Sequence, residues 1–132
     1  MTFTEAELAY LQTQWLGRLA TLAADGTLQN NPVSFKVDAE RGTIDIGGRS
    51  MGTSRKFHNV QNTGEVAFVV DEHVSADPFV VRGVEVRGRA EALTGEKPPS
   101  PFMTGEVIRI HPRKIISWSV EPGTEGMQSR KV

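Results

Sequence analysis

The sequence predicts a small, mainly β fold, an antiparallel barrel with short flanking helices. Segments in which apolar and polar residues alternate are separated by turn residues such as Ala24-Asp25-Gly26 and Asp38-Ala39-Glu40-Arg41-Gly42. Alternation of this kind is typical of half-buried strands joined by tight turns. Helical spacing occurs in only two short segments, whereas a parallel sheet needs a helix between successive strands. The 132 residues, 38% of them hydrophobic, suit one compact domain.

The first half of the chain predicts one helix followed by a strand meander. Residues 4–14 begin with Thr4 and Glu7, which are spaced as a capping box, and Leu8 and Leu11 then form an apolar stripe. Pro32 indicates a strand edge or a bulge. The strands predicted here are residues 15–23, 28–37 and 43–46.

The second half predicts a helix at residues 53–62, with Phe57 and Val60 facing inward, and four more strands. Residues 66–70 are apolar throughout, which predicts a central strand covered on both faces. Residues 94–105 contain three prolines and predict an exposed loop, and we expect the polar tail, 121–132, to be mobile unless a partner holds it. The strands are residues 66–70, 84–92, 107–110 and 115–120, which gives seven strands in all.

Composition excludes several functions. There is no cysteine, so disulfides, thiolate metal sites and cysteine nucleophiles are absent. Fifteen basic and sixteen acidic residues give a net charge of −1, without the basic excess of a nucleic-acid-binding protein. The three histidines lack metal-ligand spacing, and no serine lies in a GxSxG motif, so we expect no metal and no hydrolase triad. No apolar run is long enough to span a bilayer and the first residues do not resemble a signal peptide, so we expect a cytoplasmic protein that contacts no membrane.

Residues 47–56 combine glycines, hydroxyls and cations without a single acid. Free backbone amides, hydroxyls and a helix N-terminus suit a phosphate, so the segment predicts an anion-binding cradle. A capped helix with a solvated basic face explains the same pattern. The candidate residues are Gly47, Gly48, Ser50, Thr53, Ser54, Arg55 and Lys56.

Two other features have both a structural and a functional interpretation. Asn30-Asn31-Pro32-Val33-Ser34 would present amide and hydroxyl groups to a flat heterocycle, or would form a polar strand bulge. Trp118 has the strand parity of a core residue, and its indole also suits ring stacking or a subunit contact.

The order of the motifs along nearly the whole chain resembles the pyridoxamine 5′-phosphate oxidase-like flavin/deazaflavin oxidoreductases, and most closely the small actinobacterial branch that uses coenzyme F420. The resemblance lies in Gly17-Arg18-Leu19-Ala20-Thr21-Leu22, Pro32-Val33-Ser34-Phe35, Ile44-Asp45-Ile46-Gly47-Gly48, Lys56-x-x-Asn59-Val60, Val66-Ala67-Phe68-Val69-Val70-Asp71 and Val84-Glu85-Val86-Arg87-Gly88-Arg89-Ala90.

This resemblance implies a split β-barrel (FMN-binding split barrel) in which residues 1–132 form one flavin/deazaflavin-binding domain. It also implies a homodimer with two cofactor sites at the subunit interface. The implied function is an F420-dependent oxidoreductase that transfers a hydride from reduced deazaflavin to a conjugated, electron-poor organic substrate. No catalytic acid–base residue is needed for this chemistry, since the cofactor carries the hydride. An FMN-binding oxidoreductase of the pyridoxamine 5′-phosphate oxidase type and a non-catalytic cofactor- or tetrapyrrole-binding barrel are the alternatives.

The resemblance also assigns roles within the expected cofactor site. Pro32, Val33 and Ser34 would edge the ring, and Gly47 and Gly48 would let it approach the backbone. Ser50, Thr53, Ser54, Arg55 and Lys56 would hold the phosphate. The polar Asn30-Asn31 pair and the proline-rich residues 97–101 depart from the family pattern.

Overall fold

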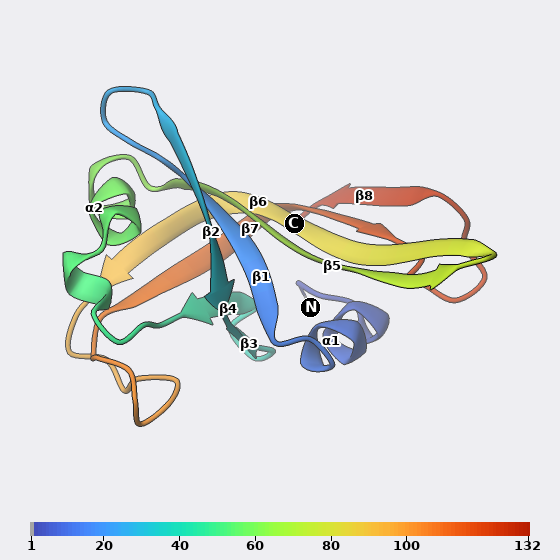
Figure 1. Ribbon diagram of the computed structural model, residues 1–132, viewed down its shortest axis with the longest axis horizontal. Coiled ribbons are helices and arrows are strands. Elements are labelled where there is room, and N and C mark those ends of the chain that lie inside the picture. The colour runs from blue at the N-terminus through green and yellow to red at the C-terminus, as the bar shows by residue number, and fades with distance from the viewer. Residues whose placement is uncertain (1) are drawn as a thin grey trace.

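The computed structural model describes residues 2–132, so Met1, the first residue of the predicted domain, lies outside them. The described chain folds into one curled antiparallel sheet with two short α-helices (Figure 1). Along the sheet the strands follow the order β2-β1-β5-β6-β7-β4-β3, and β8 pairs with β7. The elements are α1 (Glu5–Gln12), β1 (Leu16–Leu22), β2 (Leu28–Ser34), β3 (Lys36–Asp38), β4 (Thr43–Ile46), the 3-10 helix η1 (Met51–Thr53), α2 (Arg55–Asn62), β5 (Glu65–Ala76), β6 (Phe79–Leu93), β7 (Val107–Trp118) and β8 (Met127–Lys131).

The predicted fold class, a mainly β split barrel with short flanking helices, is confirmed. The strand β6 shows why the alternation was informative: Val84, Val86 and Ala90 are buried, whereas Arg87 and Arg89 are exposed. The buried side chains of the long strands meet those of the helices in one hydrophobic core. Neither helix of residues 2–132 has the length and apolarity needed to cross a membrane.

The N-terminal helix begins as predicted. The Thr4 hydroxyl accepts a hydrogen bond from the Glu7 backbone N–H (3.1 Å), and the Glu7 carboxylate accepts one from the Thr4 N–H (2.9 Å). This reciprocal pair satisfies two backbone donors that have no partner within the helix. Leu11 and Tyr10 then bury the inner face of α1 against the sheet.

The two strands expected at 107–110 and 115–120 form a single strand, β7, so the division was wrong. The pattern breaks at Pro112, which has no N–H to donate to a ladder. The register with β6 shifts opposite this point, next to Gly88. A Cβ at Gly88 would lie 2.1 Å from the His111 carbonyl oxygen. The glycine therefore lets the chains approach closely enough for the strand to continue past the proline.

Part of the C-terminal tail pairs with the sheet, whereas the sequence predicted a tail that is mobile unless a partner holds it. Residues 127–131 form β8 on the edge of β7. The Arg130 guanidinium donates to both carboxylate oxygens of Glu7 (2.7 Å each) and to the Thr2 carbonyl oxygen (2.6 Å). Because the partner of this arginine lies at the opposite end of the sequence, composition of the tail alone gave the wrong answer.

Strands β5 and β6 also extend well beyond the predicted 66–70 and 84–92, as a long hairpin arm that projects from the body (Figure 1). The charged stretch that follows Val70 concealed the extension. β5 is central, between β1 and β6. Only one of its faces is buried within the chain, however, because Ala67 and Val69 stay half-buried. The prediction that both faces are covered is therefore wrong for the single chain.

Candidate functional site

The predicted cradle lies where the chain leaves β4 and enters α2. After Gly47 and Gly48 the chain makes the short helix η1, and Ser54 then caps α2. The Ser54 hydroxyl accepts a hydrogen bond from the Phe57 N–H (3.3 Å) and donates one to the Met51 carbonyl oxygen (2.6 Å). Ser54 therefore builds the helix entrance, and the backbone N–H groups of Arg55 and Lys56, in the first turn, have no intrahelical acceptor.

The hydroxyl groups of Ser50 and Thr53 in the cradle differ in their hydrogen-bond partners. Thr53 is exposed and its hydroxyl donates to the Ser50 carbonyl oxygen (3.1 Å). Ser50 is exposed and its side chain makes no capping hydrogen bond. The structure thus brings Ser50, Thr53, Arg55 and Lys56 to one surface at the positive end of a helix, where an anion is favoured.

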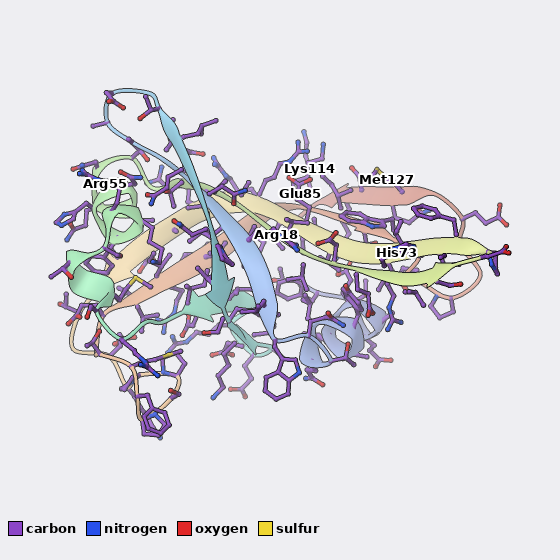
Figure 2. The ribbon with its side chains drawn as sticks, viewed as in Figure 1. Arg18, Arg55, His73, Glu85, Lys114 and Met127 are labelled. Atoms are coloured by element: carbon purple, nitrogen blue, oxygen red, sulfur yellow. The ribbon has the colours of Figure 1, made fainter. Side chains whose placement is uncertain are left out.

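The cations of this surface form no salt bridge within residues 2–132, although the Glu106 carboxylate lies close to Gly52 of the cradle. The chain has ten arginines, and eight of them form an ion pair with a carboxylate. Within residues 2–132, the two arginines without such a pair are Arg49 and Arg55, and Lys56 has none either. Both arginines belong to the predicted cradle: Arg49 lies just before η1, and Arg55 is the first residue of α2, where Figure 2 labels it. Charge that the fold leaves unpaired at one place is available to a ligand.

A pocket of about 360 Å³ adjoins the cradle, between α2 and the β1–β2 hairpin. Arg55 lines it together with Asp25 and Asn59. The Thr27 hydroxyl donates to Asp25 and lowers the pKa of that carboxyl, with a smaller contribution from Arg55. The buried Asn59 donates to the Thr21 hydroxyl (3.0 Å), and this bond fixes α2 on the sheet. Its role was not assigned from the sequence, although it lies in the quoted Lys56-x-x-Asn59-Val60 motif.

The residues predicted to edge the ring come from two strands. Pro32, Val33 and Ser34 end β2, with Pro32 exposed, Val33 buried and Ser34 half-buried. Ser34 and Gly47 line the same small pocket, of about 240 Å³. The structure therefore brings the β2 end and the glycine turn together, as the resemblance implied, although they are far apart along the sheet.

The proline loop, which we define as residues 94–106, forms the far wall of this pocket. A Cβ at Gly47 would lie 2.7 Å from the Met103 sulfur and 2.9 Å from Pro99 Cδ. The glycine thus permits a close approach, and in this structure the loop makes it. The loop was expected to be an exposed insertion, but several of its residues are half-buried against the glycine turn.

Two contacts anchor the proline loop. The Thr104 N–H donates to the Gly48 carbonyl oxygen (2.9 Å). The Arg109 guanidinium binds Asp45 through two hydrogen bonds (2.9 and 3.0 Å) and Glu96 through a third (3.0 Å), and the bond to Asp45 raises the pKa of Arg109. Arg109 lies in the Arg109-Ile110-His111-Pro112-Arg113 segment that the family resemblance includes, but the sequence assigned it no role, because only the β4–β7 pairing brings it beside Asp45.

Trp118, His73 and His111 lie away from the cradle, whereas His58 is an exposed residue of α2. Trp118 ends β7 and covers Gly83 of β6, where a Cβ would lie 2.5 Å from the indole. Its half-buried side chain serves packing within the chain. His73 packs against Phe79 in the β5–β6 arm (ring centroids 5.0 Å apart), and His111 contacts Glu91 (2.9 Å).

The comparisons with known proteins agree with this architecture. Residues 3–121 match the family model described as pyridoxamine 5′-phosphate oxidase. A 5a,11a-dehydrotetracycline/5a,11a-dehydrooxytetracycline reductase from Streptomyces rimosus is 53% identical over 122 residues, which cover 92% of this chain and 86% of the relative.

Two solved structures share the fold. A conserved hypothetical protein from Mycobacterium tuberculosis has a TM-score of 0.70 at 24% identity, covering 96% of this chain and 91% of that protein. A protein described as an F420 reductase has a TM-score of 0.65 at 22% identity, covering 86% of this chain and 98% of that protein.

Proposed function

The chain belongs to the pyridoxamine 5′-phosphate oxidase family, and from this premise we propose that it is an F420-dependent reductase of a conjugated, electron-poor organic molecule. Reduced F420 supplies a hydride when it is bound. The task of the chain is then to hold the cofactor, to orient the acceptor against it and to exclude water.

One observation carries the choice of cofactor: the unpaired Arg49 and Arg55 beside Lys56. F420 has a phosphate and a tail of carboxylates, so it offers several negative charges to these three cations. A guanidinium that already binds a carboxylate has less to gain from such a ligand. The exposed hydroxyls of Ser50 and Thr53 supply further hydrogen bonds to the phosphate.

The ring of the cofactor is proposed to lie by Ser34 and Gly47, with Pro32, Val33 and Gly48 around it. This placement is supported by the pocket that Ser34 and Gly47 share. It is also supported by the path from that pocket to the cradle, which is only the turn between β4 and η1. Residues 30–34 and 47–56 contain no carboxylate and no histidine. Asp45 lines the ring pocket, but its carboxylate is bound by Arg109 through two hydrogen bonds. The proton that completes the reduction is therefore assigned to solvent or a hydroxyl.

The substrate class is proposed from the relative in Streptomyces rimosus, whose name specifies reduction of a dehydrotetracycline. A dehydrotetracycline has a carbon–carbon double bond conjugated with a carbonyl group within fused rings. Identity of 53% over nearly the whole chain supports an acceptor of the same chemistry, a flat multi-ring enone.

A homodimer is the proposed assembly. Trp15 and Leu16, at the start of β1, are 86% and 61% exposed, and Leu28, at the opposite end of the β1–β2 hairpin, is 78% exposed. The half-buried Ala67 and Val69 add apolar surface on the neighbouring strand β5. Exposed apolar side chains on the β1–β2 hairpin and on β5 are available for contact with a partner. Sedimentation at micromolar concentration is expected to give a dimer, and a monomer would contradict the assembly.

The function is tested by titrating the purified protein with F420 and with FMN and by following oxidation of reduced F420 in the presence of 5a,11a-dehydrotetracycline. We expect F420 to bind more tightly and to be oxidised only when the acceptor is present. Because the cradle would also hold the phosphate of FMN, a yellow protein with a flavin spectrum would support the FMN oxidoreductase instead. Binding of F420 without hydride transfer to any acceptor would support the non-catalytic barrel.

A further inference from the structure

A trough of about 810 Å³ lies between the β3–β4 hairpin and the proline loop. Residues 36–40 line one side of it and residues 97–101 the other. Three of the loop residues on this wall are prolines, so the trough has an apolar side of restricted flexibility. A volume of this size suits a multi-ring organic molecule.

The trough continues into the pocket proposed for the cofactor ring. The residues common to both cavities are Lys36, Asp45, Pro99 and Ser100. Beyond them the smaller pocket reaches Ser34 and Gly47. A molecule bound in the trough therefore has its inner end beside the place where a hydride would be supplied, which is the juxtaposition that this reaction requires.

Lys36 is the cation at the inner end of the trough. It lines the trough, the ring pocket and a third cavity of about 400 Å³ that extends to Trp15. Within residues 2–132 Lys36 forms no ion pair, although it lies opposite Asp45 in the β3–β4 register. Asp45 is instead bound by Arg109 through two hydrogen bonds.

Three other charged residues of the trough, Asp38, Glu40 and Lys97, do not line the ring pocket. Asp38 accepts a hydrogen bond from the Arg41 N–H and forms an ion pair with its guanidinium (3.8 Å). Glu40, in the turn after β3, and Lys97, at the start of the proline segment, line the trough but not the ring pocket. The inner end of the trough therefore holds Lys36 and Asp45, and the Asp45 carboxylate is already bound by Arg109. The outer end holds Asp38, Glu40 and Lys97.

We propose that this trough is the substrate site and that Lys36 binds the carbonyl oxygen of the conjugated acceptor, an inference that rests on the proposed reductase function. Addition of hydride forms a C–H bond at the β-carbon and shifts the electron pair of the double bond toward the carbonyl, so negative charge develops on its oxygen. The Lys36 ammonium stabilises that charge. A proton from solvent then bonds to the α-carbon, and the substrate gains two electrons while the cofactor loses two.

The test compares Lys36→Met, which keeps the length of the side chain and removes its charge, with Lys114→Met. Lys114 is a lysine of β7 without an ion pair in the described chain, away from the trough, and is labelled in Figure 2. We expect Lys36→Met to lower kcat/KM for 5a,11a-dehydrotetracycline by about a hundredfold. Lys36→Arg should restore much of the loss, and Lys114→Met should leave both kcat/KM and the Kd for F420 at the wild-type values. Equal kcat/KM for Lys36→Met and Lys114→Met would overturn the proposal.

A wild-type protein that does not oxidise reduced F420 would instead overturn the reductase function. The trough is tested in that case by binding of tetracycline to the cofactor-free protein. Weaker binding to Lys36→Met than to Lys114→Met would support the site, and equal binding would overturn it.

Discussion

The cradle and the contact between the chain ends use the same kinds of charged residue in opposite ways. Between the chain ends, Arg130 binds a carboxylate, that of Glu7, which is 0% exposed. In the cradle, Arg49 and Arg55 are exposed and lie in no ion pair of residues 2–132. A guanidinium therefore stabilises this fold where the sheet brings a carboxylate to it. The arginines without an ion pair in residues 2–132 indicate where an anionic ligand is expected.

The largest effect should come from breaking the contact between the chain ends. Arg130→Met leaves the Glu7 carboxylate buried without its partner, which costs about 3–5 kcal/mol of unfolding free energy. Urea denaturation measures this loss. Arg18→Met is the control, because the Arg18–Asp71 pair is half-exposed and such pairs contribute about 1 kcal/mol or less. Equal losses in the two variants would erase the distinction between the regions.

Removal of the cradle cations should have a smaller effect, and on binding instead of folding. Replacing Arg49 and Arg55 with alanine is expected to weaken F420 binding by about 1.5–3 kcal/mol for each charge-assisted hydrogen bond lost, with the urea midpoint unchanged. Isothermal titration measures the affinity. Arg113→Ala, which removes an exposed arginine paired with Glu65, should bind F420 like the wild type. Unchanged affinity in the double variant would remove the cradle from the cofactor site.

Tyr10 offers a pH test of the region around α1. Burial, with help from Glu72, raises the pKa of Tyr10 from 10.0 to about 12, so the folded chain holds this proton more tightly than the unfolded chain does. Below pH 10 the phenol is neutral in both states, so its ionisation should not change the unfolding free energy. As pH rises from 10 to 12 the unfolded chain loses this proton first, and the unfolding free energy should fall. Tyr10 is the single tyrosine, so ultraviolet absorbance of tyrosinate reports it alone. A native-state titration midpoint at 10 would contradict the prediction.

The smallest expected effect is that of salt, which should weaken F420 binding at the cradle more than it weakens the Glu7–Arg130 contact. The Debye length falls from about 10 Å at 0.1 M to about 3 Å at 1 M ionic strength, so F420 affinity should drop over this range. The contribution of Arg130, measured as the difference in unfolding free energy between wild type and Arg130→Met, should change much less, because Glu7 is buried. A salt response of equal size in both measurements would show that exposure does not distinguish them.

The sequence predicted those features that depend on neighbouring residues. The capping box of Thr4 and Glu7, the alternation in β6 and the hydroxyl-rich entrance to α2 are all local patterns, and the structure contains them. The predictions of a mobile tail and of two strands in place of β7 were wrong because each structure depends on a distant partner. That partner is Glu7 for the tail and the register shift at Gly88 for β7.

The same distinction applies to the candidate site. The glycines, hydroxyls and cations of residues 47–56 are consecutive, so their composition was enough to predict a cradle. Asn59, Arg109 and the proline loop belong to the site only through tertiary contacts. The Arg109 hydrogen bonds to Asp45 and Glu96 span 64 and 13 residues, and no local sequence pattern predicts them.

The pairing of Glu7 with Arg130 also has a consequence for synthesis of the chain on the ribosome. The two residues are 123 positions apart. At roughly 5–20 residues per second, Arg130 is added on the order of ten seconds after Glu7. During that interval α1 cannot dock as it does in the finished protein without burying an unpaired carboxylate. Docking of the first helix is therefore among the last steps by which the nascent chain reaches its final fold.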